Sequence, residues 1–448
     1  MLNIKYNLEK SSKIMNITFI GSGYVGLVSG VMMSYLGHNV TCLDNDEAKI
    51  SKLNKKILPI YEAKLDKYFM QALEHERLKF ASFYNDELKN TEAVFITVGT
   101  PSKESGEADL SYVYEAIDKV SLHINKDCLI VIKSTVPPSS CNNIIDYLKA
   151  KGFSFNIASN PEFLREGNAV KDFLYPDRIV IGVNNKESEH ILRKIYTPLT
   201  DNGAELVVTD LVTAELIKYG SNSFLATKIA FINEMANLCE KIGANIKDLS
   251  NGIGLDKRIG TAFLNAGPGF GGSCFPKDIL ALNSIITNNH IDSKILEAVI
   301  TSNRERPNFM VDKIATLLDE DLKGKNIAVL GLTYKAGTDD VRASPAIEII
   351  KNLLDKGAYV KAFDPMGLEN AQKTFKNENL LYLDFAIKAC DFADAIVITT
   401  EWSEFQELDW QKIYSLVKSP IIIDLRNILK ADEMESIGFR YYTVGSKI

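Results

Sequence analysis

One of the six cysteines stands in a segment whose composition favours a reactive thiol. The segment 267–278 reads GPGFGGSCFPKD and is followed by the periodic apolar run 279–289. Pro276 suits the first position of a helix, so Cys274 should lie at or just before a helix N-terminus. That position, with Lys277 close by, lowers the pKa of a thiol and favours the thiolate nucleophile. We therefore expect Cys274 to be a nucleophile and the other five cysteines, which lie in apolar patterns, to be packing groups.

A glycine-rich segment has the spacing of a dinucleotide-binding turn. It follows the expected strand NITFIG and opens a helical stretch. Asp44, which ends the next strand, lies 18 residues after Gly26. Glycines permit the tight turn and the close approach of a pyrophosphate, and the carboxylate can accept from ribose hydroxyls. Acidic residues and no arginine follow Asp44, so NAD is expected rather than NADP. The motif consists of Gly21, Ser22, Gly23, Tyr24, Val25 and Gly26.

Two further pairs of polar residues have helical spacing. Segment 159–167 (SNPEFLREG) predicts a short helix capped by Asn160, which would place Glu162 and Glu166 one turn apart on one face. A solvated acidic turn is the alternative interpretation.

Lys218 and Asn222 are also four residues apart, on the expected long helix 210–243, within an apolar stripe. An amine and an amide in such a stripe are unusual on a purely structural helix, although a lysine can extend to solvent. Asp210 is the expected N-cap and Gly243 the expected end. The helix would be about 45–50 Å long and is expected to link two domains. Its apolar residues, Phe224 and Phe231 among them, are interpreted first as core and second as a subunit interface.

The elements that must position these residues alternate between strand and helix. From Met15 onward the order of apolar strands and helices is typical of a parallel, doubly wound sheet. A second series begins near residue 325, and in it Gly331 and Asp364 correspond to Gly21 and Asp44. The chain therefore resembles two related nucleotide-binding halves. The second half lacks the glycine motif, and its loop 331–342 offers Lys335 and Arg342, which suits binding a phosphate by side-chain charge.

The composition excludes several classes of protein. With 46% hydrophobic and 24% charged residues, the chain has the composition of a folded globular protein, and at 448 residues two or three domains are expected. The net charge of −7 without long charge runs argues against nucleic-acid or membrane partners. Without CxxC pairs or clustered histidines, neither a metal site nor a disulfide framework is expected. Residues 1–14 read as a tail before a possible native start at Met15. With no signal peptide and no apolar run near 20 residues, a cytoplasmic location is expected.

Six segments together resemble the UDP-glucose/GDP-mannose dehydrogenase family, in order and from Met15 onward. They are GSGYVG (21–26), TVGTP (97–101), KSTVPPS (133–139), the stretch 160–182, AELIKYGSNSFLA (214–226) and, above all, GFGGSCFPKD (269–278). The resemblance implies two Rossmann-like α/β domains joined by a long central helix. The expected organisation is a tail (1–14), an NAD-binding domain (15–208), a central helical and dimerisation region with the cysteine loop (209–306) and a UDP-sugar-binding domain (307–448).

The resemblance also implies an activity. UDP-glucose would be oxidised at C6 to UDP-glucuronate through a thiohemiacetal and a thioester on Cys274, with two NADH formed per turnover by a homodimer or higher oligomer. GDP-mannose or a UDP-N-acetyl-hexosamine is the alternative substrate within the family. A non-catalytic NAD and nucleotide-sugar sensor is an alternative of another class. A two-electron hydroxy-acid dehydrogenase is disfavoured because it has no use for a poised cysteine.

Catalytic roles carried over from the family fall on residues of four segments. Lys218 would stabilise the developing oxyanion, and Asn222 would bind substrate or help to hold the oxyanion. Asp278 and Glu162 would assist water activation and proton transfer. The full catalytic set is Cys274, Lys218, Asp278, Asn222, Glu162, Thr135 and Glu166, the last two near the reactive end of the cofactor and a catalytic water.

Binding roles follow in the same way, and no metal is among them. Asp44 and Lys49 would hold the adenosine ribose, and Arg342 would reach the cofactor from the second half. Arg426 matches a position that reaches a neighbouring subunit's site, although DLRN (424–427) differs from the glycine-containing form common in the family. The cofactor set is Gly21, Gly23, Tyr24, Val25, Gly26, Asp44, Lys49, Thr100, Thr135, Glu166, Lys277 and Arg342. The substrate set is Glu162, Phe163, Leu164, Lys218, Asn222, Arg258, Phe263, Leu264, Gly271, Lys335 and Arg426.

Overall fold

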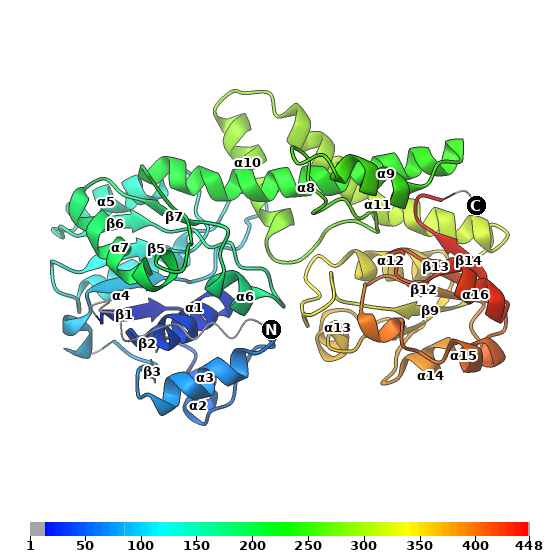
Figure 1. Cartoon of the computed structure of the whole chain (residues 1–448), viewed down its shortest axis with the longest axis horizontal. Helices are drawn as coiled ribbons and strands as arrows, with labels where there is room; N and C mark the ends of the chain where they lie inside the picture. Colours follow the sequence, from blue (N-terminus) through cyan, green and yellow to red (C-terminus); the bar gives the residue numbers. More distant parts are fainter. Residues whose placement is uncertain (1–13, 85, 447–448) are drawn as a thin grey trace. The chain divides into compact units, whose positions relative to one another are not determined.

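The first half of the chain builds an eight-stranded sheet in the order β3-β2-β1-β4-β5-β6-β7-β8 (Figure 1). The computed structural model describes residues 14–84 and 86–446, so most of the predicted tail 1–14 lies outside the described residues. Neighbouring strands are parallel except β6 and β7, which pair antiparallel at Ser159 and Gly182, so the predicted sheet is parallel with one exception. The strands are β1 (Asn16–Ile20), β2 (Asn39–Leu43), β3 (Leu78–Ala81), β4 (Ala93–Ile96), β5 (Leu129–Ile132), β6 (Asn156–Ser159), β7 (Ile179–Gly182) and β8 (Leu206–Thr209).

The second half builds a six-stranded, fully parallel sheet in the order β11-β10-β9-β12-β13-β14. Counted from the first strand of each half, the first six strands of both sheets follow the order 3-2-1-4-5-6 of a Rossmann fold. The prediction of two related halves is therefore confirmed. The strands are β9 (Asn326–Leu330), β10 (Tyr359–Phe363), β11 (Leu380–Tyr382), β12 (Ala395–Ile398), β13 (Ile421–Asp424) and β14 (Arg440–Thr443).

Helices cover both faces of each sheet. In β4, Ala93 and Phe95 pack into one apolar cluster while Val94 and Ile96 pack into another, because successive side chains of a strand point to opposite faces. The helices of the first half are α1 (Tyr24–Tyr35), α2 (Glu47–Asn54), α3 (Leu65–Glu74), α4 (Ser111–Ser121), α5 (Ser140–Ala150), α6 (Ala169–Leu174) and α7 (Lys186–Thr200), with a 3₁₀ turn at Asp86–Asn90. Those of the second are α9 (Ile246–Gly254), α10 (Phe275–Asn288), α11 (Lys294–Leu317), α12 (Pro345–Asp355), α13 (Leu368–Thr374), α14 (Ala386–Cys390), α15 (Trp410–Leu416) and α16 (Ala431–Ile437), with a 3₁₀ turn at Ser403–Phe405.

A single long helix, α8 (Leu211–Ile242), joins the two halves, as predicted. Its first turn is capped by Asp210, whose Oδ1 accepts from the Thr213 N–H at 2.9 Å. The chain divides into two compact units, 1–220 and 221–448, and α8 contributes to both. The domain boundaries at 208/209 and 306/307 stay a prediction.

Two of the apolar residues of α8 that were first interpreted as core lie on its exposed face. Phe224 and Phe231 are 67% and 49% exposed, so the expectation that they belong to the core is wrong for this chain.

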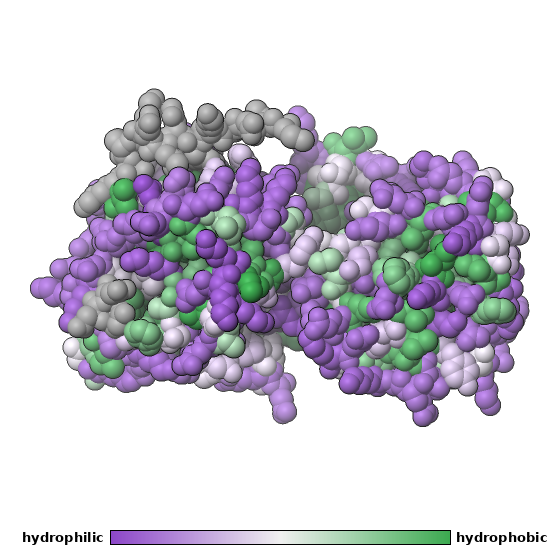
Figure 2. Space-filling view, turned by 90° about the horizontal axis from the view of Figure 1, so that it is seen from below, coloured by the Kyte–Doolittle hydropathy of each residue, from purple (hydrophilic) through white to green (hydrophobic). Residues whose placement is uncertain are grey.

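Hydrophilic residues cover most of the face shown in Figure 2. Among the described residues no helix is both long and apolar enough to cross a membrane.

Candidate active site

The glycine motif lies where β1 ends and α1 begins, at the point where the strand order of the first sheet reverses between β1 and β4. Gly21 has φ +98° and donates its N–H to the Leu43 carbonyl at 2.7 Å. A Cβ on Gly26 would lie 1.9 Å from the Gly21 carbonyl oxygen. Only glycine therefore allows α1 to start this close to the strand, which is the geometry that lets a backbone cradle a pyrophosphate.

Asp44 follows β2 and faces the same turn. Its Oδ2 accepts from the Ser22 N–H at 2.7 Å and from Lys49 Nζ at 2.8 Å, and its Oδ1 accepts from the Asp46 N–H at 3.0 Å. Burial raises the pKa of the Asp44 carboxyl, but the bonds from Lys49 and the two backbone N–H groups outweigh it, so the pKa is lowered overall. The carboxylate is ionised at neutral pH and suits ribose hydroxyls, whereas a 2′-phosphate would be repelled.

Asp44→Asn is expected to raise the Kd for NAD about tenfold, since the charged acceptor for the ribose hydroxyls is lost. The loss should be smaller for NADP, because the repulsion of its 2′-phosphate is relieved. Titration of both cofactors by protein fluorescence measures the change. Asp46→Asn is the matched control, since Asp46 caps α2 through the Lys49 N–H and asparagine caps equally well. Equal loss for NAD and NADP in Asp44→Asn would contradict the assignment.

Asp364, the corresponding carboxylate of the second half, has all its acceptor sites hydrogen-bonded by the protein itself. Asp364 is buried, and its two oxygens accept six hydrogen bonds from the protein. A carboxylate offers about four lone-pair sites, so Asp364 has no capacity left for a ribose. The donors are the N–H groups of Leu332, Thr333, Met366 and Gly367, the Thr333 hydroxyl and the Trp402 indole.

The segment around Glu162 is irregular, so the predicted helix over 159–167 is wrong. Asn160 caps no helix: its Oδ1 accepts from Lys133 Nζ at 3.0 Å and from the Tyr196 hydroxyl, and its Nδ2 donates to the Val180 carbonyl at 2.8 Å. These partners come from distant parts of the chain and fix the segment that follows β6. Glu162 and Glu166 therefore do not share a helical face.

Glu162 and Lys218 form a buried ion pair within the first unit. Lys218 Nζ lies 3.1 Å from Glu162 Oε1, and the two side chains are 4% and 7% exposed. Glu162 Oε2 also accepts from the Leu164 N–H, and the ring of Phe163 lies 5.3 Å from the Lys218 ammonium. The structure thus brings Lys218 of the long helix together with Glu162, Phe163 and Leu164 of the segment 159–167, which were predicted as separate motifs.

Lys133 is a buried amine that the sequence analysis did not select. Burial lowers the pKa of Lys133 to about 8, the charge of Glu162 opposes this, and the charge of Lys218 adds to it. Lys133, Glu162 and Lys218 therefore form one buried charge cluster. The available signal was a lysine directly after a fully buried strand.

The turn that carries Glu166 is fastened to the glycine motif through Glu62. Gly167 donates its N–H to Glu62 Oε2 at 2.7 Å, and the Tyr24 hydroxyl donates to the same oxygen. Burial and then the neighbouring Glu62 raise the pKa of Tyr24, so the phenol stays protonated. Glu62 was not predicted, because its partners lie 38 and 105 residues away.

Thr100 and Thr135, both predicted near the cofactor, are in contact. The Thr100 hydroxyl donates to the Thr135 carbonyl at 2.9 Å. The ends of the loops after β4 and β5 are thereby fixed to each other, on the side of the sheet where a doubly wound fold binds its ligand.

Cys274 occupies the N-cap position of α10, as predicted, with Pro276 at the second helical position instead of the first. It is partly exposed, whereas the other five free cysteines are buried. Burial raises the pKa of Cys42, Cys128 and Cys390 to about 12. Cys274 is therefore the thiol that combines access with the N-terminus of a helix.

Asp278 lies one turn into α10 and is 1% exposed. Its Oδ2 accepts from Asn222 Nδ2 at 2.6 Å, and its Oδ1 pairs with Lys277 Nζ at 2.6 Å. The predicted residues Lys277, Asp278 and Asn222 therefore form one cluster in the second unit, with the carboxylate held on both oxygens, and Cys274 lies one helical turn before Asp278.

The glycines before Cys274 are required by their neighbours. A Cβ on Gly271 would lie 2.1 Å from the Ala343 carbonyl oxygen. Gly272 has φ +83°, donates its N–H to the Arg342 carbonyl at 2.9 Å, and would place a Cβ 2.8 Å from the Tyr334 ring. The loop therefore lies directly on the segment that carries Arg342.

The remaining predicted binding residues differ in how accessible they are. The Arg342 and Arg258 guanidinium groups are mostly exposed and pair with Asp340 and Asp256, respectively. Lys335 lies 5.5 Å from the Tyr334 ring. The two arginines are thus accessible from solvent, and the binding roles of all three cations stay predictions.

Three other predicted substrate residues make contacts within the chain. Leu264 is buried in the core of the second half, and its place in the substrate set stays a prediction. Phe263 has φ +64° and packs against Phe275 with ring centroids 6.0 Å apart. Arg426 donates to the carbonyls of Thr399 and Tyr334 at 3.0 and 2.9 Å, so it braces the loop before Lys335. Its part in a neighbouring subunit's site stays a prediction.

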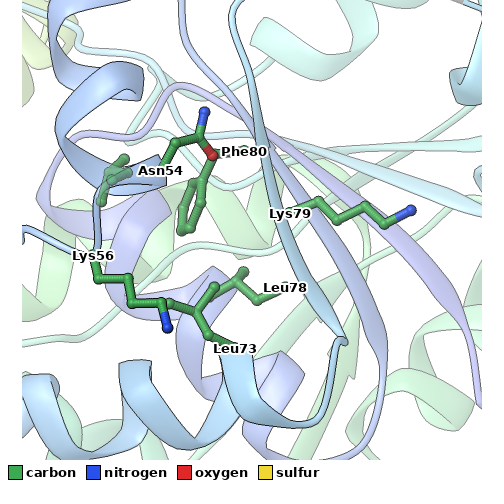
Figure 3. A pocket seen from close by; sticks show the side chains of 7 residues that line it. Asn54, Lys56, Leu73, Leu78, Lys79 and Phe80 are labelled. Atoms are coloured by element: carbon green, nitrogen blue, oxygen red, sulfur yellow. The ribbon is translucent and has the colours of Figure 1, made fainter.

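A surface pocket at the edge of the first sheet contains no predicted site residue. Figure 3 shows Leu73, Leu78 and Phe80 from α3 and β3 lining it, with Lys79 directed away from them. Its lining consists of leucines, a phenylalanine, an asparagine and two lysines and includes no carboxylate or thiol, and we assign it no role.

Three family descriptions match successive parts of the chain. They are the NAD binding domain (15–200), the central domain (212–305) and the UDP binding domain (328–431) of the UDP-glucose/GDP-mannose dehydrogenase family. The UDP-glucose 6-dehydrogenase of Rickettsia bellii is 92% identical over 97% of this chain and 100% of its own length. That of Rhizobium meliloti is 46% identical over 96% and 99%.

Solved structures give the same result for the fold. A UDP-glucose dehydrogenase from Pyrobaculum islandicum superposes with a TM-score of 0.90 at 36% identity, covering 98% of this chain and 99% of that one. The UDP-N-acetyl-mannosamine dehydrogenase Cap5O from Staphylococcus aureus superposes with a TM-score of 0.77 at 25% identity, covering 96% and 98%. The chain therefore belongs to the UDP-glucose/GDP-mannose dehydrogenase family.

Proposed function

We propose that the protein oxidises UDP-glucose at C6 to UDP-glucuronate and reduces two NAD in each turnover. The observation that carries the proposal is the accessible thiol of Cys274 at the N-terminus of α10, one helical turn before the buried Asp278, in a chain that also has an NAD-binding domain. Relatives that are 76–92% identical bear the name UDP-glucose 6-dehydrogenase, which favours UDP-glucose over the other nucleotide sugars of the family.

A covalent intermediate suits the chemistry, because an alcohol loses four electrons on its way to a carboxylate and one NAD accepts only two, so the product of the first oxidation must be retained. The first oxidation gives a C6 aldehyde, and the Cys274 sulfur then adds to C6 while the aldehyde oxygen takes a proton. Loss of a second hydride and a proton turns this thiohemiacetal into a thioester. Water then adds to C6, the S–C6 bond breaks, and the acid and the thiol are released. Bound NAD supplies the acceptor for each hydride.

Lys218 is proposed to stabilise oxygen that becomes negative at C6. Its ammonium is buried and oriented by Glu162 at 3.1 Å, and a fixed charge in a dry site acts more strongly than one in water. Glu162 would accept and return the proton that moves with the alcohol oxygen. The nearby Lys133 amine adds positive charge to the same cluster.

Asp278 is proposed to orient the water that hydrolyses the thioester. Asn222 holds one of its oxygens at 2.6 Å, and Lys277 holds the other. Since Asn222 lies one turn after Lys218 on α8, one helix presents both groups. Thr135 and Glu166 are proposed to line the reactive end of the cofactor, while Arg258, Lys335 and Arg342 are proposed to bind phosphate groups.

The stoichiometry of the reaction tests the function. We expect two NADH per UDP-glucose consumed, with no free aldehyde, measured by absorbance at 340 nm and by chromatography of the sugar nucleotides. One NADH with a released aldehyde would refute the four-electron scheme. GDP-mannose and UDP-N-acetylmannosamine, assayed in parallel, should react poorly. A clear preference for either would identify the alternative substrate, and tight binding without NADH would favour the sensor.

We also propose that the chain acts as a homodimer or higher oligomer in the cytoplasm. The exposed apolar residues Phe224, Phe231, Leu238 and Ile242 follow one another along α8, and apolar surface of this kind is typical of a subunit interface. The six free cysteines suit a reducing compartment. Sedimentation as a monomer alone at micromolar concentration would contradict the assembly.

A further inference from the structure

We propose that Asn303 is a positioning residue that clamps the loop 267–272 and so fixes the place of the Cys274 thiol. The inference rests on the proposed function, because it assigns Asn303 a part in that reaction. Asn303 lies on α11, outside every motif that the sequence analysis selected.

The clamp is a pair of hydrogen bonds to one residue of the loop. Asn303 Oδ1 accepts from the Phe270 N–H at 2.8 Å, and its Nδ2 donates to the Phe270 carbonyl at 3.0 Å. The side-chain amide thus pairs with both backbone groups of Phe270, as a neighbouring strand would. Only an amide has a donor and an acceptor in this arrangement.

The loop is shaped to receive this amide. Gly269, directly before Phe270, has φ +118°, and a Cβ there would lie 2.9 Å from Asn303 Oδ1. Glycine is therefore required both by the backbone conformation and by the approach of Asn303. The glycine and the asparagine form one fitted contact.

A second pair of bonds holds the start of the same loop. The Gly267 N–H donates to Asn233 Oδ1 at 2.8 Å, and the Gly267 carbonyl accepts from Arg306 Nε at 2.9 Å. Arg306 is buried, one helical turn after Asn303 on α11. Two loop residues thus have both backbone groups paired with side chains of the helices α8 and α11.

The clamped residue is connected to the thiol by a short path. Three residues, 271–273, separate Phe270 from Cys274, and Gly272 is fixed on the other side by the Arg342 carbonyl. The Phe270 ring also packs edge-on against Phe275, the first residue of α10, with centroids 6.0 Å apart. A shift of Phe270 would therefore reach the sulfur through both the backbone and the ring contact.

Asn303→Asp tests the clamp because it keeps the shape and the acceptor but removes the donor to the Phe270 carbonyl. We expect kcat/KM for UDP-glucose to fall at least about tenfold, mainly in kcat, since near-attack geometry is lost. The rate at which iodoacetamide alkylates Cys274, followed by mass spectrometry of its peptide, should change at least about threefold. The Kd for NAD should stay the same. Asn308→Asp, the same change at an exposed position of α11, should alter none of these.

Each result bears on the proposal. If kcat/KM and the alkylation rate in Asn303→Asp both stay within twofold of the wild type, the clamp is refuted. Alkylation of the buried cysteines would show that the Asn303→Asp variant is unfolded. In that case Gly269→Ala tests the clamp instead, because its methyl group displaces the intact Asn303 amide and should change the alkylation rate of Cys274. Unchanged Cys274 alkylation in that variant also refutes the clamp. If the wild type forms no NADH but the alkylation rates differ as expected, the proposed function fails while the clamp stands.

Discussion

Cys274→Ala is expected to lower the rate of NADH formation from UDP-glucose by about 10⁴-fold or more, because removal of a covalent nucleophile costs most of the catalytic rate. The first oxidation alone cannot sustain turnover, since the aldehyde has no sulfur to receive it. Steady-state assays at saturating NAD, together with a measurement of UDP-glucose binding, check the prediction. Binding should be retained, because the methyl group leaves the N-cap backbone of α10 in place.

Cys390→Ala is the matched control for this variant. Cys390 is fully buried in α14, so its truncation should lower the free energy of unfolding slightly and leave NADH formation unchanged. Undiminished turnover by Cys274→Ala would remove the nucleophile from the scheme. A loss of activity in both variants would point to instability as the cause.

Lys218→Met is expected to lower kcat by about 10²–10³-fold, the usual cost of removing one preorganised oxyanion donor. It should also reduce the free energy of unfolding by about 3–5 kcal/mol, because the buried Glu162 carboxylate loses the ammonium 3.1 Å away. Assays of kcat and urea denaturation measure the two effects. Lys241→Met, at an exposed position near the end of the same helix, should change neither.

A double variant separates the two roles of Lys218. In Lys218→Met/Glu162→Gln the isolated buried charge is removed, so much of the lost stability should return, while kcat should stay low because both Lys218 and the proposed proton acceptor Glu162 are gone. Recovery of kcat together with stability would show that Lys218 acts only by holding the fold. Loss of stability without loss of kcat in the single variant would lead to the same conclusion.

Local sequence patterns were sufficient for the elements whose geometry is set by nearby residues. The turn at Gly21, the N-cap of α8 and the start of α10 at Cys274 all depend on residues within a few positions. The duplication of the fold was also visible, because the apolar strands and their flanking residues recur in the same order.

Features set by distant partners could not be predicted in this way. Asn160 and Pro161 have the local pattern of a helix start, but the bonds of Asn160 to Lys133, Tyr196 and Val180 replace that helix. The antiparallel pairing of β6 with β7 likewise has no local signal. Asn303 meets Phe270 across 33 residues, so no spacing rule would select it.

The six hydrogen bonds to Asp364 show that two halves of a chain can share a fold and still differ in what they can bind. In both halves the carboxylate after the second strand fastens the turn after the first, through the Ser22 N–H at Asp44 and the Leu332 N–H at Asp364. The two halves differ in how many acceptor sites of this carboxylate are left for a ligand after the protein's own donors have bound. An engineer who wished to install a second dinucleotide site would therefore need to take donors away, at Thr333 and Trp402, before adding any glycine.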